Sequence, residues 1–300
     1  MYDAKKKDNQ LEKARAAYAV DKDAWRDIYV KVEQDLHFLS DEQDAQWDSQ
    51  AAQQRRAEGK PVISVDQLGQ FIHQVVNDIR QNTPTINVIP HSSGSREETA
   101  KIIKGLIKNI EYRSSADSVY DSAVDFSVKG GIGWIRVDHD YETDTGFDQE
   151  LIIKSVSNPT SVILDSRSIM PDGSDAKHCF VLENMSVKDF QERWPGFEPC
   201  SFTASDAELE RERTSSEVTI AEYFYIEEEQ IEIGIRFETD PMTGEPAEII
   251  EEVQKDVTYE NTRKTSKKSV KRCYLSGKDV LEETEFPGKY IPIIPVYGEQ

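Results

Sequence analysis

The sequence has 300 residues, enough for one large domain or two smaller ones with a substantial core. Its 57 acidic and 36 basic residues give a formal net charge of -21, which opposes indiscriminate binding to nucleic acid or anionic membranes. Three widely spaced cysteines fit neither a disulfide framework nor a zinc finger. Without an apolar leader or a membrane-spanning run, we expect a cytosolic chain with no membrane partner.

The first predicted element is a long amphipathic helix over residues 8–39, which contain neither glycine nor proline. Its apolar positions follow steps of three and four: Leu11, Ala14, Tyr18, Trp25, Ile28, Val32 and Leu39. Asp21 and Asp35 fall on the same seam, which argues against a continuous coiled coil. We therefore expect the seam to pack on a protein surface and to contribute to a contact with a neighbouring subunit.

Residues 40–59 are polar, with Trp47 the only large apolar residue, and predict an exposed helix or mobile arm. Together with the long helix they form an N-terminal helical arm over residues 1–59. Asp66 then caps a helix with the best amphipathic pattern in the chain. Its apolar positions, which we expect in the core, are Leu68, Phe71, Ile72, Val75, Val76 and Ile79. Residues 85–90, bounded by prolines, predict a short edge strand.

Two capped helices and a glycine pair follow. Ser95 and Glu98 form a capping box ahead of a helix with apolar residues at positions 102, 103, 106, 107 and 110. Ser114 or Ser115 can cap a second helix, which Gly130 and Gly131 end, because glycine adopts the left-handed C-terminal conformation without a steric penalty. The glycine spacing fits neither a dinucleotide fingerprint nor a Walker loop, so we interpret the pair as a structural turn.

The next segments are β-rich. Residues 132–138 and 150–156 predict an antiparallel hairpin, so residues 60–148 form a region of helices with a hairpin. Residues 149–300 form a β-rich region with strand patterns at 179–182 and 289–297, and two strand-like runs on either side of residues 227–229 within 218–235. Ser186 caps a short helix, and residues 240–244 form a turn. The predicted fold class is α+β, with amphipathic helices first and antiparallel β structure second.

Charge separates sharply in the second half. Residues 206–252 contain sixteen acidic and three basic residues, whereas residues 254–272 contain seven basic and two acidic ones. The basic run is either a solvated loop or a contact with DNA phosphates or an acidic partner. Its candidate contact residues are Arg263, Lys264, Lys267, Lys268, Lys271 and Arg272. Only Tyr259 and Tyr274 lie nearby for base stacking, so we favour a subunit or partner contact on a loop.

No catalytic motif is recognisable, and we expect no catalytic residue, no cofactor and no metal. The best enzymatic alternative is a metal-dependent phosphodiesterase or nuclease that uses the oxygen ligands of the hairpin. These residues are Asp138, His139, Asp140, Asp144 and Asp148; alternate residues of a strand share a face, so Asp138 and Asp140 alone converge. A second cluster that could bind a metal combines Asp172, Asp175, His178 and Cys179.

A collinear series of short motifs resembles the portal proteins of short-tailed bacteriophages of the lambdoid Salmonella type. The series spans nearly the whole chain, from about residue 25 to residue 299. It comprises DIRQNTP at residues 78–84, INVIP at 86–90, GGIGW at 130–134, DS at 165–166, SDAKHC at 174–179, IAEYFY at 220–225 and IPIIPVYGE at 291–299. No single motif is specific, and the order of the motifs carries the resemblance.

The resemblance implies a structural subunit rather than an enzyme. Family members form dodecameric rings at one capsid vertex, the conduit for genome packaging and ejection. The implied partners are the terminase large subunit, tail adaptor proteins, capsid and scaffold proteins, and transient, non-specific double-stranded DNA. The implied location is the virion, after assembly in the host bacterial cytoplasm. Stem or wing helices are expected at residues 97–129 and clip-like β structure within 150–295; another phage head-tail adaptor is the alternative. Family chains are far longer than this sequence.

Overall fold

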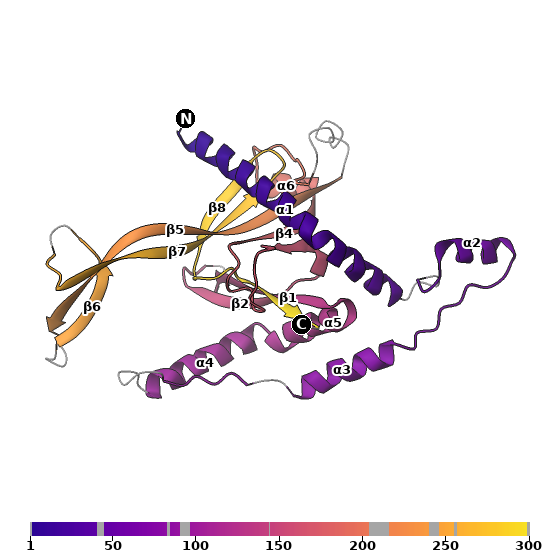
Figure 1. Ribbon diagram of the computed structural model, residues 1–300, viewed down its shortest axis with the longest axis horizontal. Coiled ribbons are helices and arrows are strands. Elements are labelled where there is room, and N and C mark those ends of the chain that lie inside the picture. Colours follow the sequence, from indigo (N-terminus) through magenta and orange to yellow (C-terminus); the bar gives the residue numbers. More distant parts are fainter. Residues whose placement is uncertain are drawn as a thin grey trace.

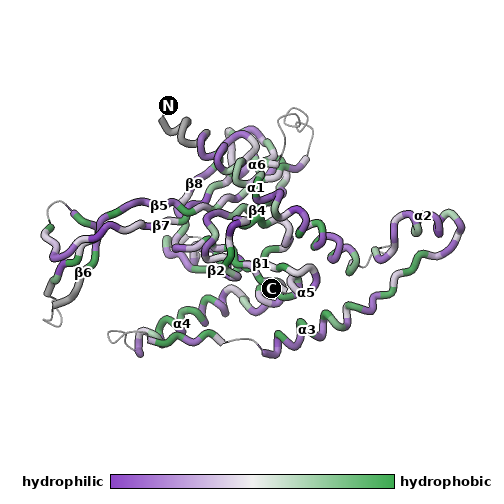
Figure 2. Tube along the Cα trace, viewed as in Figure 1, coloured by the Kyte–Doolittle hydropathy of each residue, from purple (hydrophilic) through white to green (hydrophobic). Residues whose placement is uncertain are grey.

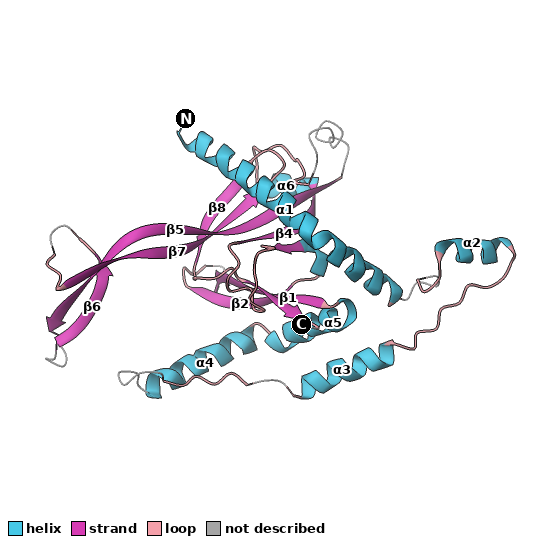
Figure 3. Ribbon diagram, in the orientation of Figure 1, coloured by secondary structure: helices cyan, strands magenta, loops and turns pink. Residues whose placement is uncertain are grey.

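The computed structural model describes residues 2–40, 45–82, 85–90, 97–143, 145–203, 216–239, 246–254 and 257–298 (Figure 1). Helices dominate the first half and antiparallel strands the second (Figure 3), which confirms the α+β prediction. The helices are α1 (Tyr2–Phe38), α2 (Ser49–Ala57), α3 (Gly69–Gln81), α4 (Glu97–Arg113), α5 (Ala116–Gly130) and α6 (Val187–Arg193). The strands are β1 (Ile132–Tyr141), β2 (Gln149–Ser155), β3 (Val162–Leu164), β4 (His178–Ser186), β5 (Glu217–Thr239), β6 (Pro246–Glu252), β7 (Asn261–Leu275), β8 (Val280–Phe286) and β9 (Ile293–Tyr297).

The smaller sheet has the strand order β2-β1-β9. Strands β1 and β2 pair antiparallel, from Ile135 opposite Ser155 to Tyr141 opposite Gln149, which confirms the predicted hairpin. The C-terminal extended segment forms β9, an edge strand along β1, and Pro295 lies opposite Trp134. Proline is tolerated there because an edge strand leaves one side without ladder hydrogen bonds.

The larger sheet has the order β3-β4-β5-β7-β8, and β6 pairs with the distal part of β5. The prediction of two strand-like runs between residues 218 and 235 is wrong, because β5 is one strand of 23 residues. Glu228 continues the ladder directly opposite Lys268 of β7, and opposite charges in facing positions stabilise a strand pair. The parts of β5, β6 and β7 that lie within residues 227–269 project from the body (Figure 1), and we call them the arm. The turn predicted at residues 240–244 lies outside the described residues.

The apolar seam of α1 packs into the main core of its own chain. Tyr18 makes edge contacts with Phe180 and Phe202, and the Trp25 indole donates a hydrogen bond to the Leu164 carbonyl at 2.8 Å. The seam residues in this core are Leu11, Ala14, Tyr18, Trp25, Tyr29 and Val32. For these buried positions the expected contact with a neighbouring subunit is wrong, because strands distant in the sequence already cover them. Ile28, also on the predicted seam, is 48% exposed.

Helix α3 packs on α5, and α4 packs on β2 and α5; most residues of both helices are exposed. The predicted core position of the α3 pattern is wrong for most of its residues, since Val76 alone is buried while Phe71 is 59% exposed. Apolar residues recur along both helices (Figure 2), and several of them are exposed, such as Ile102 and Leu106 of α4. Residues 85–90 contain no strand, because no described strand pairs with them. Ser95 lies outside the described residues, whereas Ser115 precedes α5 without a side-chain capping bond.

The glycine pair joins α5 to β1. Gly131 has φ +82° and follows the last residue of α5; its N–H donates to the Ser127 carbonyl at 2.9 Å, and its own carbonyl accepts a 2.9 Å bond from Gly298. A Cβ on Gly130 would lie 3.0 Å from Val32 of α1. The turn therefore brings α1, α5 and the chain after β9 into close contact.

We expect Gly131→Val to lower the free energy of unfolding by roughly 1–3 kcal/mol, because a β-branched residue is strained at positive φ. Gly105→Ala is the matched control: this helical glycine has open space where a Cβ would lie, and removing chain freedom from the unfolded state should stabilise the protein slightly. Thermal melts of both variants check the prediction. An unchanged midpoint for Gly131→Val would contradict it.

Candidate functional site

The six candidate contact residues lie along β7, so the expectation of a loop is wrong. Strand β7 returns antiparallel to β5 and places Lys268 opposite Glu228, Lys267 opposite Glu229 and Lys264 opposite Glu232. The acidic and basic blocks that are separate in the sequence thus face each other across one strand pair. The hairpin itself brings the two charge blocks together.

Ion pairs connect these strands at several points. Lys268 Nζ lies 3.4 Å from Glu228, and Lys267 Nζ lies 3.1 Å from Glu252 of β6. These side chains are about half exposed, and such pairs contribute about 1 kcal/mol or less each. The facing positions favour this register, because a shift by one residue in either direction would move Lys264 from Glu232 to an isoleucine, although Lys268 would still face a glutamate.

The body end of the basic run has closer ionic partners. Lys271 Nζ lies 2.8 Å from Glu285 of β8, and this hydrogen bond raises the pKa of Lys271. Arg272 turns toward the smaller sheet, with its guanidinium 3.4 Å from Asp138. Arg272 therefore belongs to a polar network between the two sheets, unlike the exposed lysines of the arm.

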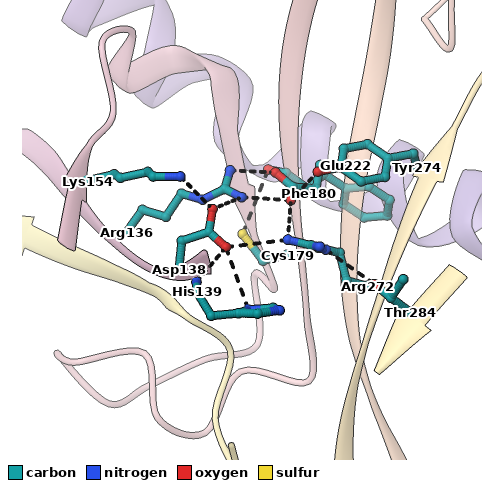
Figure 4. A network of polar contacts seen from close by, with 10 residues as sticks. All are labelled: Arg136, Asp138, His139, Lys154, Cys179, Phe180, Glu222, Arg272, Tyr274 and Thr284. Carbon is teal, nitrogen blue, oxygen red and sulfur yellow. Dashed lines mark hydrogen bonds and ion pairs between the residues drawn. The ribbon is translucent and has the colours of Figure 1, made fainter. Parts of the chain in front are cut away.

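Figure 4 shows this buried network, which we call the intersheet network. Arg136 of β1 donates two hydrogen bonds to Glu222 of β5, at 2.6 and 2.8 Å, and one to Asp138 at 3.1 Å. Lys154 of β2 lies 3.2 Å from Asp138, and the Tyr274 hydroxyl donates to Glu222 at 3.2 Å. With Arg272, three cations thus surround two carboxylates at the junction of the sheets.

Charge compensation governs ionisation in the network. Burial disfavours the Asp138 carboxylate, but the Arg136 charge and a backbone hydrogen bond from His139 outweigh burial and lower its pKa. Burial likewise disfavours the Arg136 cation, but Glu222 outweighs it and raises the pKa of Arg136. Both groups are therefore charged at neutral pH. Arg136 links β1 to β5 through its hydrogen bonds to Glu222.

The geometry does not support a metal-binding pair on the hairpin. Asp138 is buried and is already within hydrogen-bonding or ion-pair distance of Arg136, Lys154 and Arg272. Asp140 lies farther along β1 and is exposed, as is Asp148; Asp144 lies outside the described residues. Asp138 and Asp140 therefore do not converge on an open site, so the described residues do not support the pair on which the phosphodiesterase alternative depends.

The second predicted cluster also separates in the structure. Asp172 and Asp175 accept backbone hydrogen bonds within an exposed loop, and Cys179 is buried in the core. His178 instead lies 2.5 Å from Asp21 of α1 and 3.8 Å from Asp165. Among the described residues, Asp21, Asp165 and His178 are the group of histidine and acidic side chains whose ligand atoms lie close enough together to share a cation.

The hydrogen bonds of Asp21, Asp165 and His178 connect α1 to the larger sheet. Asp21 accepts from both the backbone and the hydroxyl of Ser166, while Asp165 accepts from the backbone of Lys177 and Arg167. Burial opposes Asp21 ionisation, but hydrogen bonds from His178 and Ser166 outweigh burial and lower its pKa. The carboxylates are thus occupied by protein donors.

Sequence reasoning missed the partners of these buried charges. A charged residue within an otherwise apolar pattern could have indicated these buried charges. The three cases are Asp21 on the α1 seam, Arg136 between Ile135 and Val137, and Glu222 after Ala221. A charge at such a position indicates a buried partner. It does not indicate which partner, because that depends on strand order.

The lowered pKa values of Asp21 and Asp138 predict acid sensitivity. A folded-state pKa below the unfolded value of about 3.8 means that the unfolded chain binds more protons. The stabilisation is therefore present at neutral pH and should be lost as pH falls below about 3.8. Guanidinium unfolding at pH 7, 4 and 3 measures the loss. Asp138→Asn should show a weaker pH dependence than the parent over this range; an identical dependence would contradict the assignment.

The charges described above join strands, sheets and a helix. The chain matches the family model described as "Phage P22-like portal protein" over residues 15–300 and belongs to that family. It is 23% identical over 257 residues to the portal protein of Acyrthosiphon pisum secondary endosymbiont phage 1. The aligned region covers 80% of this chain and 35% of that protein. The chain thus spans about a third of the length of this curated relative. The resemblance inferred from the motif series is confirmed.

No helix in the described parts of the chain combines the length and apolar character needed to cross a membrane.

Proposed function

We propose that the chain is part of a structural subunit of a phage portal ring at the capsid vertex. The observation that carries this proposal is the family match, which extends over residues 15–300. The ring would serve as the conduit for genome packaging and ejection, in the virion, after assembly in the host bacterial cytoplasm. Its partners would be the terminase large subunit, tail adaptor proteins, and capsid and scaffold proteins.

The charge of the chain supports a conduit role. A net charge of -21 repels the DNA backbone, so contacts with double-stranded DNA would be transient and non-specific. Weak contacts suit a channel in which DNA slides. We further propose wing or stem helices at residues 97–129 and clip-like β structure within residues 150–295, as the resemblance to portal proteins implies.

Ring formation is the test of this function. The purified protein should form closed rings with a central channel by electron microscopy, and native mass spectrometry should give a single subunit count, twelve if the family pattern applies. A protein that stays monomeric at micromolar concentrations would contradict the proposal.

We also propose that the basic run contacts a neighbouring protein surface rather than DNA. The support is its position on the projecting arm, where Lys264, Lys267 and Lys268 are exposed, and the absence of stacking aromatics within the run. We expect a variant with Lys264, Lys267, Lys268 and Lys271 changed to Gln to assemble less well at low salt, with DNA affinity unchanged. Because such contacts are electrostatic, high salt should remove the difference.

A matched control changes the exposed α1 residues Lys13, Lys22 and Lys31 to Gln. This variant removes positive charge from the body and should assemble as the parent does. If the basic run binds phosphate instead, the slope of log affinity against log salt should fall by about 0.9 for each phosphate that the Gln variant no longer neutralises. That result would overturn the preference for a protein partner.

A further inference from the structure

The arm has an apolar face that is partly exposed: Ile231, Ile233 and Ile235 are half-buried, whereas Phe237 and Ile250 are exposed. Ile231, Ile233, Ile235 and Phe237 alternate along β5 and therefore share one face; Ile250 of β6 lies opposite Ile235 and extends it. We call these five residues the arm face. Phe237 is 52% exposed and Ile250 is 59% exposed. No described helix lies along the arm in Figure 1.

The opposite side of the arm is covered by its own chain. The Tyr259 ring packs on Gly234, where a Cβ would lie only 2.4 Å from the ring, and the Tyr259 hydroxyl donates to Glu251 at 3.1 Å. The two sides of the arm thus differ: the Tyr259 ring and the Arg236–Glu251 ion pair close one side, whereas the other side carries the arm face and the Lys267–Glu252 ion pair. An exposed apolar patch of this kind, rimmed by charges, is typical of an interaction surface.

A second apolar surface lies on α3. Leu68, which precedes the helix, and Phe71, Val75 and Ile79 are between 43% and 59% exposed; we call these four residues the helix face. In Figure 1 the arm extends to the left, whereas α3 lies toward the right of the lower edge. The arm points away from the helix face of its own chain, so a contact between them requires a second copy.

Charge makes the two surfaces complementary. Residues 227–269, which include the arm, carry twelve acidic and six basic residues. Residues 45–113, which include α2, α3 and α4, carry nine basic and seven acidic residues. The helical layer thus has an excess of two positive charges in a chain with a net charge of -21, so the acidic residues of the arm, as distinct from the lysines of the basic run, would meet weak attraction there.

We propose that the arm face of one copy packs on the helix face of the neighbouring copy. The two surfaces differ, so the contact is heterologous, and a heterologous contact repeated through a rotation closes a ring. The inference rests on the proposed portal ring and names the surfaces that would join its subunits. It assigns the arm as the element that reaches the neighbour and the α3 surface as the receptor for it.

The test uses one substitution on each surface, Phe237→Glu on the arm and Phe71→Glu on α3. Both side chains are more than half exposed, so each monomer should fold, which circular dichroism verifies. Each change should weaken subunit association about tenfold or more, as truncation of a central interface residue does. Native mass spectrometry and sedimentation velocity measure the assemblies. Ile169→Glu, at a residue 89% exposed outside both faces, is the control and should assemble normally.

Mixing the two variants distinguishes this contact from a symmetric one. Each mixture contains one intact arm face and one intact helix face, so we expect paired copies but no closed rings. Combining Phe237→Glu with Phe71→Lys in one chain should restore assembly in part, because opposite charges then face each other. If either Glu variant fails to fold, Phe237→Ser and Phe71→Ser repeat the test.

The outcomes separate the inference from the proposed function. Rings that form as well in the Glu or Ser variants as in the parent would overturn the arm contact and leave the portal ring intact. A similar loss in Ile169→Glu would also overturn the assignment, since the effect would not depend on the two faces. A parent that never assembles would overturn the ring itself.

Discussion

Replacing Arg136 with Met should lower the free energy of unfolding by about 3–5 kcal/mol, the cost of removing one partner from a buried ion pair. The substitution leaves the Glu222 carboxylate, only 4% exposed, without its two strongest hydrogen bonds. Asp138 also loses a charge partner at 3.1 Å. Guanidinium unfolding measures the loss. The expected size is large because the remaining carboxylates cannot reach water.

The control is Arg26→Met on α1, where the ion pair with Asp23 is 65% exposed on the arginine side. That change should cost less than about 1 kcal/mol. Combining Arg136→Met with Glu222→Gln should cost less than the sum of the single changes, since both remove the same interaction. A loss of less than about 1 kcal/mol for Arg136→Met alone would show that the network does not hold the sheets together.

Trp25→Ala should be similarly severe, at about 3–5 kcal/mol, because it removes a large buried side chain and leaves a cavity. Trp25 stacks on Tyr29 and contacts Trp134 of β1. Ile28→Ala is the matched control on the same helix, because Ile28 is 48% exposed and should cost less than about 1 kcal/mol.

The Trp25→Ala variant also tests whether the α1 seam packs within its own chain or against another subunit. If the α1 seam packs within its own chain, the loss of stability caused by Trp25→Ala should not depend on protein concentration. A loss that disappears on dilution would instead mean that the seam is buried between copies. Guanidinium unfolding at two protein concentrations about a hundredfold apart measures this.

Local signals predicted the elements that depend on nearby residues. The glycine pair after α5 and the hairpin of β1 and β2 both arise within a short stretch, where cap and turn preferences dominate. The Ser186 cap of α6 is likewise local, as its hydroxyl accepts from the backbone of Asp189 at 3.1 Å. Such elements can be predicted without knowing how the rest of the chain folds.

Predictions failed where a distant segment decided the outcome. The α1 seam looked unpartnered because the strands that cover it lie more than a hundred residues away, as the bond from Trp25 to Leu164 shows. The α3 pattern looked like core because amphipathicity reveals an apolar face but not what covers it. In β5, three consecutive glutamates resembled a break until β7 supplied facing lysines.

The candidate site shows the same division. The sequence identified Lys264, Lys267 and Lys268 as a charged group but could not give their partners, because antiparallel register sets them. The intersheet network was invisible for the same reason: Arg136 and Glu222 lie 86 residues apart and meet only when two separate sheets pack together. Composition reveals which charges exist, whereas topology determines which of them meet.

The length of β5 gives the molecule a mechanical property. A strand of 23 residues spans about 75 Å, and this one runs without interruption from Phe224, fully buried in the body, to the end of the arm. Tension applied at the arm would therefore travel along a covalent backbone to Glu222 and, through Arg136, into the smaller sheet. The β5 and β7 ladder would carry that load in shear, shared among many hydrogen bonds at once. The arm would thus be anchored to the smaller sheet through the Arg136–Glu222 ion pair.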